Sequence, residues 1–359
     1  MTDMKAWGFP QEYVIQDDLV PARVTAVHKE RYEIACPHGE AYARLKSNSY
    51  HFESGENFPT AGDYVEIQYN PIGDSLIVHT LERKTLFSRP DSTTSGQTEQ
   101  VVAANFDYVF ILSSLNQDFN LRRIERYLTQ AWQSGGYPVV VLTKADLCDD
   151  AAEKAGEVES VAPGVPVIPV SSVTGEGIEA LEEYLKPGST AVLLGMSGVG
   201  KSSLLNAVAG QTMMEVGDIR EEDARGRHTT THRHLFRLSS GAMIIDTPGM
   251  RSIGMWDVSE GLGEAFSDIE ELMLQCLFSD CAHDTEPNCA VKAALESGEL
   301  SPQRWKNYKS LEREAKYSEN KQQYLRERSA KHVAFNVAQR QKKKSQSKSH
   351  RMGAGHGNY

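Results

Sequence analysis

The chain has 359 residues, of which 40% are hydrophobic and 24% charged, and its formal net charge is −11 at pH 7. This length exceeds that of one ordinary domain and predicts two or three. There is no uninterrupted apolar stretch of about 18 residues, and the first residues lack the apolar core of a signal peptide, so we expect a cytoplasmic protein without a membrane segment.

The charge is unevenly distributed along the chain. Residues 328–359 contain eight Lys or Arg and no Asp or Glu, whereas the rest holds 30 basic and 49 acidic residues. An acidic body argues against a general nucleic-acid-binding surface but allows a local anionic partner. The basic tail has few apolar residues and is expected to be disordered, either to neutralise phosphates or only to keep the chain soluble.

The first 86 residues predict an extension followed by a barrel. Residues 1–19 carry scattered aromatic side chains without a period, and we interpret them as an extension lying on the first domain. Residues 20–86 hold five short alternating runs separated by turn residues, which predicts a five-stranded β-barrel of the OB-fold type. Such barrels often bind single-stranded nucleic acid. The alternative is a barrel that only supports its neighbour.

After a polar linker at residues 87–105, the pattern becomes that of an α/β domain, which we place at residues 106–256. Apolar runs alternate with amphipathic stretches, and this alternation predicts a mostly parallel sheet. The expected strands cover residues 107–112, 138–142, 165–170, 190–194 and 242–245, and the expected helices cover residues 121–128, 149–161, 178–185 and 203–208. Ligands of such sheets bind at the carboxyl ends of the strands.

The strand at residues 190–194 leads into Gly-Met-Ser-Gly-Val-Gly-Lys-Ser. The spacing G-x-x-x-x-G-K-S predicts a loop whose backbone N–H groups surround the phosphates of a nucleotide. Lys201 would reach the β- and γ-phosphates, and Ser202 would bind magnesium. We assign nucleotide binding to Gly195, Met196, Ser197, Gly198, Val199, Gly200, Lys201, Ser202 and Ser203.

Two other strand ends carry residues suited to a guanine base. The sequence Thr143-Lys144-Ala145-Asp146 is close to N-K-x-D, in which the carboxylate of Asp146 would accept hydrogen bonds from the ring N–H and the exocyclic amine. Lys144 would lie along the base and ribose. Thr143 replaces the usual Asn and lacks the amide that helps tie this loop to the phosphate loop, so we expect guanine affinity to be modest. Taken alone, the sequence also suits a surface turn.

A backbone N–H near Ser171 or Ser172, at the next strand end, would meet the guanine O6. Beyond the phosphate loop, the run Gly-Arg-His-Thr-Thr-Thr ends at Thr231 and suits a loop around magnesium and the γ-phosphate, with Thr230 or Thr231 as the ligand. The sequence leaves that choice open.

A D-x-x-G pattern follows at the end of a further strand. Asp246 would hold the magnesium, usually through water, and the N–H of Gly249 would sense the γ-phosphate. Met250 follows, where many relatives carry a glutamine that orients the attacking water. A thioether cannot do this, so we expect slow intrinsic hydrolysis that a partner accelerates. Lys201, Asp246, Gly249 and His228 are the candidate catalytic residues, although His228 also suits a solvated loop.

The order of these motifs is unusual because the base-reading sequence precedes the phosphate loop and D-x-x-G comes last. Conventional guanine-nucleotide enzymes begin with the phosphate loop. The chain therefore resembles a circularly permuted GTPase. Permutation preserves a packed sheet if the original termini lie close together.

A second candidate site lies in residues 257–327, which we expect to form a helical zinc-binding domain with helices at residues 290–297 and 303–326. Cys276, Cys281, His283 and Cys289 are three thiols and an imidazole within fourteen residues. This composition predicts one structural, tetrahedral Zn²⁺. Free buried cysteines or a single disulfide are the alternative.

Barrel, permuted GTPase and Cys-x4-Cys-x-His-x5-Cys together resemble the RsgA (YjeQ) family of ribosome small subunit-dependent GTPases, over about residues 20–325. The resemblance implies a cytoplasmic enzyme, expected to be monomeric, that uses Mg²⁺ with GTP. It would bind the nearly mature 30S subunit and hydrolyse GTP when docked there. It would also promote 16S rRNA maturation and release of another assembly factor.

Two other classes compete with this interpretation. A phosphate-loop ATPase or kinase would bind ATP as well as GTP, and Asp146 argues against it. The other is an RNA-binding module that is not an enzyme, in which the nucleotide only stabilises the fold.

Overall fold

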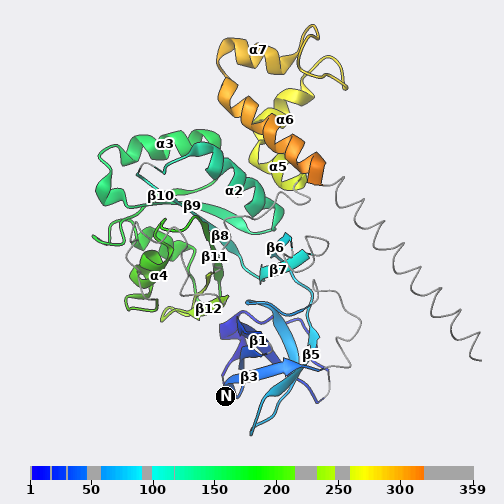
Figure 1. Ribbon diagram of the computed structural model, residues 1–359, viewed down its shortest axis with the longest axis vertical. Coiled ribbons are helices and arrows are strands. Elements are labelled where there is room, and N and C mark those ends of the chain that lie inside the picture. Colours follow the sequence, from blue (N-terminus) through cyan, green and yellow to red (C-terminus); the bar gives the residue numbers. More distant parts are fainter. Residues whose placement is uncertain are drawn as a thin grey trace, which may run out of the picture.

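The computed structural model describes residues 2–16, 18–29, 31–46, 58–90, 99–116, 118–214, 233–246 and 259–318. Figure 1 shows a small barrel at one end, an α/β domain in the middle and a group of helices at the other end. Within the described residues, no helix combines the length and apolar character needed to cross a membrane.

The barrel is built from five strands, as predicted. They are β1 (Val20–Val27), β2 (Tyr32–Cys36), β3 (Gly39–Leu45), β4 (Tyr64–Gln68) and β5 (Ser75–Thr80). β1 pairs with both β2 and β4, and β3 pairs with β5 in parallel, so the strands form a closed ring. Ile34, Ile67 and Ile77 are fully buried inside it. The prediction of a five-stranded barrel is confirmed.

The segment that we interpret as a linker contains a hairpin-like pair that the sequence analysis missed. β6 (Leu86–Pro90) and β7 (Glu99–Ala104) pair antiparallel. Phe87 is buried and its ring stacks on that of Phe106 at 5.1 Å. Apolar residues at the two ends of the segment therefore give this pair its own anchor in the core.

The α/β domain has the predicted mostly parallel sheet, in the order β10-β9-β8-β11-β13-β12. Its strands are β8 (Tyr108–Ser114), β9 (Tyr137–Thr143), β10 (Val167–Pro169), β11 (Thr190–Gly195), β12 (His234–Arg237) and β13 (Met243–Asp246). β8, β9, β10, β11 and β13 are parallel, and β12, which the sequence analysis did not predict, is antiparallel to β13.

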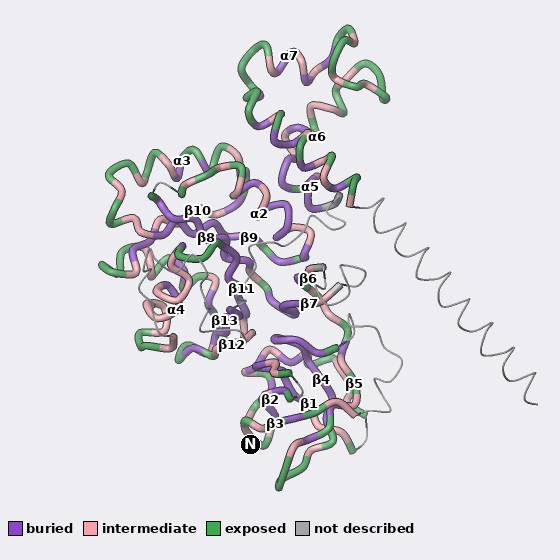
Figure 2. The backbone as a smooth tube through the Cα atoms, viewed as in Figure 1, coloured by how far each residue is buried: buried purple, intermediate pink, exposed green. Residues whose placement is uncertain are grey.

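Helices cover both faces of this sheet, as Figures 1 and 2 show. α2 (Leu121–Gln133) and α3 (Ala151–Val161) pack on one face, and α4 (Lys201–Ala209) packs on the other. The predicted helix at residues 178–185 is a short 3₁₀-helix, η5 (Glu179–Glu183), which also contributes to the second face. Figure 2 shows most of the central strands of this sheet as buried.

Barrel and α/β domain meet at one edge. Ala26 of β1 pairs antiparallel with His234 of β12, which joins both units in an 11-stranded sheet. Arg23 of β1 is fully buried at this junction and donates to the carbonyl of Trp7 at 2.7 Å and to that of Asn105 at 2.8 Å. It also donates to Thr190 Oγ1 at 3.0 Å, at the start of β11.

The N-terminal extension belongs to the same junction. It begins with η1 (Met4–Trp7), which Asp3 caps by accepting from Lys5 N. Met4, Trp7 and Phe9 are buried in the core that also holds β8 and β11 residues. The extension therefore packs between the two domains, whereas the sequence analysis predicted that it lies on the first domain.

The C-terminal helices are α5 (Ser259–Ala265), α6 (Ser267–Leu274), α7 (Ala290–Ser297) and a helix at residues 302–318. The last two lie where the sequence predicts them, although residues 319–326 lie outside the described part of the chain. α5 packs closely on α2, since a Cβ on Gly261 would lie 2.2 Å from the carbonyl oxygen of Thr129. The apolar core of these helices is continuous with the α2 face of the sheet.

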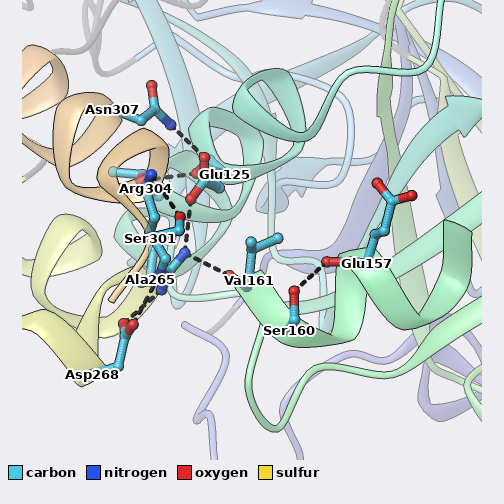
Figure 3. Close-up of polar contacts among 10 residues, drawn as sticks. Glu125, Glu157, Ser160, Val161, Ala265, Asp268, Ser301, Arg304 and Asn307 are labelled. Atoms are coloured by element: carbon cyan, nitrogen blue, oxygen red, sulfur yellow. Dashed lines mark hydrogen bonds and ion pairs between the residues drawn. The ribbon is translucent and has the colours of Figure 1, made fainter. Parts of the chain in front are cut away.

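An ionic cluster around the buried Arg304 and Glu125, drawn in Figure 3, fixes this C-terminal unit to α2. The guanidinium of Arg304 donates to Glu125 Oε1 of α2 at 2.7 Å, to Asp268 of α6 at 2.6 and 2.8 Å, and to two backbone carbonyls. Asn307 donates to the other Glu125 oxygen at 2.6 Å. Burial raises the pKa of Glu125, against the opposing effects of Arg304 and Asn307. We call these four side chains the Arg304 cluster.

Candidate functional site

The loop at residues 195–200 leaves the carboxyl end of β11, every residue of which is buried. Gly198 and Gly200 have φ angles of 75° and 104°, a region that residues with a Cβ rarely adopt. A Cβ on Gly195 would lie 2.9 Å from the carbonyl oxygen of Leu112 on neighbouring β8. The three glycines are therefore required by backbone geometry. The predicted strand, loop and helix occur in sequence, with α4 beginning at Lys201.

Lys201 folds back over this loop. Its Nζ donates to the carbonyl oxygens of Gly195 at 2.8 Å and Met196 at 2.7 Å. These two bonds hold the ammonium group against the first two residues of the phosphate loop. The first turn of α4 contributes Ser202 and Ser203, whose backbone lies at the positive end of the helix dipole.

The base-reading sequence lies beside the phosphate loop and is bonded to it. Thr143, at the end of β9, is buried, and its Oγ1 donates to the carbonyl of Val199 at 2.6 Å. Lys144 adopts a φ of 61°, and its Nζ donates to the carbonyl of Gly198 at 3.0 Å. The amide is absent, but the two loops are still bonded, because the threonine hydroxyl spans the gap from the buried strand end to the loop.

The other base-reading residues sit at the same edge of the sheet. Ala145 N donates to the carbonyl of Val170 at 3.1 Å, which holds the turn containing Asp146 against the loop after β10. Asp146 is exposed and Ser172 half-buried. Ser171 is buried, and its Oγ accepts from two backbone N–H groups of its own turn. The structure therefore brings both predicted base-contacting loops together, with the carboxylate accessible to a ligand.

Asp246 completes the described part of this edge. It ends β13, is buried and pairs in register with Leu193, two residues before the phosphate loop. Gly249, His228, Thr230 and Thr231 lie outside the described residues. Their predicted roles toward magnesium and the γ-phosphate stay predictions.

A pocket lined in part by the phosphate loop also contains residues that the sequence analysis did not assign to a site. Met196, Ser197 and Val199 of the loop form one wall, and the end of β8 and the first turns of α2 form the other. The lining residues of that second wall include Ser114, Asp118, Arg123, Ile124 and Tyr127. The sequence shows only an apolar face on this helix, so nothing in its periodicity marks Arg123.

The four predicted zinc ligands converge, with all donor atoms within 4.8 Å of one another. Cys276 Sγ lies 3.9 Å from Cys289 Sγ, and His283 Nδ1 lies 3.5 Å from each of these sulfurs. Thiolates around a tetrahedral zinc at about 2.3 Å would be about 3.8 Å apart. The donor set and its spacing therefore fit a Cys3His zinc site, and nothing is left open for a substrate.

The turn that carries these ligands is stabilised locally. Glu286 accepts from the backbone N–H groups of Ala282 at 3.0 Å and Asp284 at 3.1 Å. Hydrogen bonds from backbone N–H groups lower the pKa of Glu286 to about 2, first that of Glu286 itself and then those of Ala282 and Asp284. The carboxylate is thus ionised at neutral pH and closes the ligand loop.

Strand order and motif order define the class of protein. The phosphate loop follows β11 in the middle of the sheet, and the base-reading loop on β9 precedes it in sequence, so the domain is a circularly permuted P-loop GTPase. Two solved structures share the fold. YjeQ from Thermotoga maritima superposes with a TM-score of 0.62 at 29% identity, covering 82% of this chain and 97% of that one. YloQ, a circularly permuted GTPase, gives 0.58 at 23% identity, covering 85% and 98%.

Sequence relatives identify the family. A small ribosomal subunit biogenesis GTPase RsgA 1 from Listeria monocytogenes is 50% identical over 299 residues, 83% of this chain and 84% of the relative. The RsgA of Streptomyces avermitilis is 45% identical over 83% of this chain and 80% of its own. The sequence model of the RsgA GTPase family matches residues 80–256. The chain belongs to the RsgA GTPase family, and its activity is hydrolysis of GTP.

A sequence model of the ABC transporter family also matches, over residues 178–353. That range contains the phosphate loop, which both kinds of nucleotide-binding protein use. It leaves out β8, β9 and the base-reading sequence, so it does not account for the arrangement of the sheet.

Proposed function

We propose that this GTPase acts in late maturation of the 30S ribosomal subunit in the cytoplasm. As a monomer it binds the subunit, hydrolyses GTP when docked, and promotes 16S rRNA maturation and release of another assembly factor. The observation that carries the proposal is the hydrogen bond from Thr143 to Val199, which joins the base-reading loop to the phosphate loop at one edge of the sheet. The relatives of this chain are named small ribosomal subunit biogenesis GTPases.

The nucleotide roles that we propose follow this edge. Asp146 selects guanine, Lys201 contacts the β- and γ-phosphates, and Asp246 with Ser202 holds magnesium. When bound, Mg²⁺ neutralises charge on the phosphates. Met250 lacks the amide or carboxylate that could orient water. Slow turnover in the free protein, and faster turnover when a docked partner orders the site, follow from this.

The test is steady-state GTP hydrolysis by the purified chain alone, with 30S subunits and with 50S subunits. We expect stimulation by 30S subunits only, and a Lys201→Ala variant sets the background. Equal rates with and without 30S subunits would contradict the proposal. Competition by ATP that is as effective as competition by GTP would favour a general nucleotidase. Full biological activity of the Lys201→Ala variant would favour an RNA-binding module whose role does not require catalysis.

We further propose that Cys276, Cys281, His283 and Cys289 hold one structural Zn²⁺. Chelation of the ion should lower the stability of the helices at residues 259–318, because these side chains would lose their common anchor. Metal analysis of protein purified without chelators should find about one zinc per chain. Cys281→Ser should reduce the zinc content, whereas Cys36→Ser, in the barrel, should not. A zinc-free native protein would contradict this assignment.

A further inference from the structure

We propose that the turn carrying the zinc ligands is a docking surface for a lysine- and arginine-rich protein segment, and not for RNA. Three exposed apolar residues, Leu274, Leu277 and Phe278, lie at the centre of this surface, and we call them the Leu277 patch. The proposal rests on the proposed function for the place of the encounter, the 30S subunit. It deepens that function by naming the class of partner that the C-terminal unit contacts there.

The Leu277 patch consists of apolar residues that lie outside the core of the C-terminal unit. Leu274, which ends α6, is 87% exposed, Leu277 is 63% exposed and Phe278 is 44% exposed. Phe266 and Ile269, in contrast, are fully buried. Among the exposed large apolar residues of the described part of the chain, only the patch places three within five consecutive positions. Single exposed leucines are ordinary, whereas clustered apolar residues mark interaction surfaces.

The turn that carries the patch is fixed by backbone bonds and by the zinc ligands. Cys276 N donates to the carbonyl of Met273 at 3.2 Å, and Cys281 N donates to that of Phe278 at 3.3 Å. Cys276 and Cys281 flank the patch residues Leu277 and Phe278 and belong to the set of ligands whose donor atoms converge. Figure 2 shows most of the loop between α6 and α7 as exposed. A surface that is ordered before binding loses less conformational entropy when a partner docks.

The charge around the patch is strongly negative. Residues 264–299 contain nine Asp or Glu and a single basic residue, Lys292. Three of the carboxylates have partners within the unit: Asp268 bonds to Arg304, Glu270 accepts from Tyr308 and Glu286 accepts from backbone N–H groups. The other six are exposed and form no ion pair within the described part of the chain; they belong to Glu264, Glu271, Asp280, Asp284, Glu296 and Glu299.

The zinc ligands and the neighbouring helix do not reverse this charge. Three thiolates outweigh the charge of one Zn²⁺, so the proposed zinc site adds one negative charge when the ion is bound. Lys309 lies over the ring of Trp305, which contacts the His283 ring edge to face. Its Nζ donates to Glu312 at 2.8 Å, so this cation is already paired. The exposed carboxylates therefore determine the sign of the surface.

An apolar patch surrounded by carboxylates fits one kind of partner. Lys and Arg have apolar stems that can cover leucine and phenylalanine while their charged ends reach carboxylates. An arginine can also lie over the Phe278 ring. RNA binds through phosphates that need Lys or Arg on the protein, and a surface with this charge repels them. Electrostatic complementarity therefore favours a basic protein segment.

The first experiment replaces Leu277 by the photo-crosslinking amino acid benzoylphenylalanine in the full chain. The chain is irradiated with 30S subunits after co-sedimentation has shown that it is bound. We expect an adduct that survives ribonuclease and contains a peptide of a subunit protein by mass spectrometry. An adduct to rRNA, or none from a bound chain, would overturn the proposal. An adduct formed without subunits, to residues 328–359 or to a second copy, would also overturn it, because the chain itself would then cover the patch.

The second experiment measures affinity for 30S subunits after changes at this surface. Leu277→Ser removes an apolar contact, and Glu271→Gln with Asp280→Asn removes two charges. Glu153→Gln with Glu157→Gln removes two charges from exposed positions of α3 and is the matched control. We expect each variant at the surface to bind about fivefold more weakly and the control to stay within about twofold of the wild type. A surface variant that binds like the control would overturn the proposal. Zinc content and melting temperature check that each variant is folded.

A third measurement separates this proposal from the proposed function, because it uses no ribosomal subunit. The probes are a labelled synthetic peptide of alternating Arg and Leu and a labelled single-stranded RNA of the same length, and fluorescence anisotropy reports binding to the full chain. We expect Glu271→Gln with Asp280→Asn to weaken peptide binding about fivefold and to leave RNA binding unchanged. Equal peptide binding by wild type and variant would overturn the docking surface. Failure of the chain to sediment with 30S subunits would contradict the proposed function and leave this comparison intact.

Discussion

Thr143 shows how one hydroxyl can replace a longer side chain at a nucleotide site. The usual asparagine would span to the phosphate loop with an amide. Here the buried threonine donates to the Val199 carbonyl at 2.6 Å, and the neighbouring Lys144 donates to Gly198. Two adjacent residues of the base-reading loop therefore hold consecutive residues of the phosphate loop, and this would couple the proposed base binding to phosphate binding.

Thr143→Val keeps the shape of this side chain and removes the hydroxyl. The buried Val199 carbonyl would lose its donor, at a cost of about 1 kcal/mol, so we expect GTP and GDP to bind about fivefold more weakly. Titration with a fluorescent guanine nucleotide measures the change. Thr143→Ser, which retains the hydroxyl, is the control and should bind like the wild type. Unchanged affinity in Thr143→Val would show that the bond does not support the site.

At the scale of elements, α5 and α2 are in contact because α5 has glycine where it meets the other helix. A Cβ on Gly261 would lie 2.2 Å from Thr129 O and 2.7 Å from Gln133 N. Gly261 N also donates to Gln133 Oε1 at 2.9 Å. The approach of these helices brings the C-terminal unit close enough for Arg304 to reach Glu125.

Gly261→Ala should force α5 away from α2. We expect a loss of about 1 to 3 kcal/mol in the free energy of unfolding, from overpacking against backbone atoms. Gly263→Ala, on the same helix, meets no atom within 4 Å and is the matched control. It should be neutral or stabilise by about 0.5 to 1 kcal/mol, since alanine is the better helix former. Urea unfolding compares the two, and equal stabilities would contradict the close packing.

The barrel carries a pH-sensitive link at one end. Asp74 accepts from Arg31 Nη2 at 2.6 Å and from Arg44 Nε at 2.6 Å. These bonds join the residue before β5 to the residue before β2 and to strand β3. The hydrogen bond from Arg44, which has the largest effect, and the bond from Arg31 hold the pKa of Asp74 below its usual 3.8. The ionised carboxylate therefore stabilises the folded barrel above the unfolded-state pKa, and this contribution disappears as the pH falls through the folded-state pKa.

Asp74→Asn should lower the melting temperature at pH 7, by a few degrees at most because exposed ion pairs are weak. The difference between wild type and variant should shrink below pH 4 and in high salt. Melting curves from pH 3 to 7 measure it. A difference that stays constant across this range would mean that charge is not responsible.

At the scale of the whole molecule, Arg23 ties the barrel to the GTPase domain. It is fully buried and bonds to Trp7, Asn105 and Thr190, which come from the extension, the end of the β6–β7 pair and the strand of the phosphate loop. Its charge lies over the Tyr64 ring, 4.7 Å from the centroid. The single backbone pairing between β1 and β12 is therefore reinforced by a side chain that contacts four parts of the chain.

Arg23→Leu would leave several buried carbonyl oxygens without a donor. We expect a loss of about 3 kcal/mol or more in unfolding free energy, with the barrel separating from the α/β domain first. Arg23→Lys, which keeps the charge but supplies one nitrogen, should lie between leucine and the wild type. Urea unfolding followed by hydrogen exchange on β1 and β11 measures both. A leucine variant within about 0.5 kcal/mol of the wild type would contradict this role.

Local sequence determined the elements and motifs of this protein. The five barrel strands, the strand and loop ending at Lys201, the base-reading turn at Asp146 and the Cys3His set are each specified within a few residues, by alternation, glycine placement or ligand spacing. The short strand β12, the helices α5 and α6, and the β6–β7 pair were missed, because their runs are brief and acquire their stability from neighbouring strands and helices.

Only the tertiary structure decided how these pieces meet. The bond from Thr143 to Val199, the location of Arg123 across a pocket from the phosphate loop, the bond from Arg23 to Asn105 and the bond from Arg304 to Glu125 all join residues 56 or more positions apart in the chain. A basic residue looks the same in sequence whether it faces water or a buried carboxylate. Which partner it contacts depends on how the strands and helices pack, and these long-range contacts couple the domains.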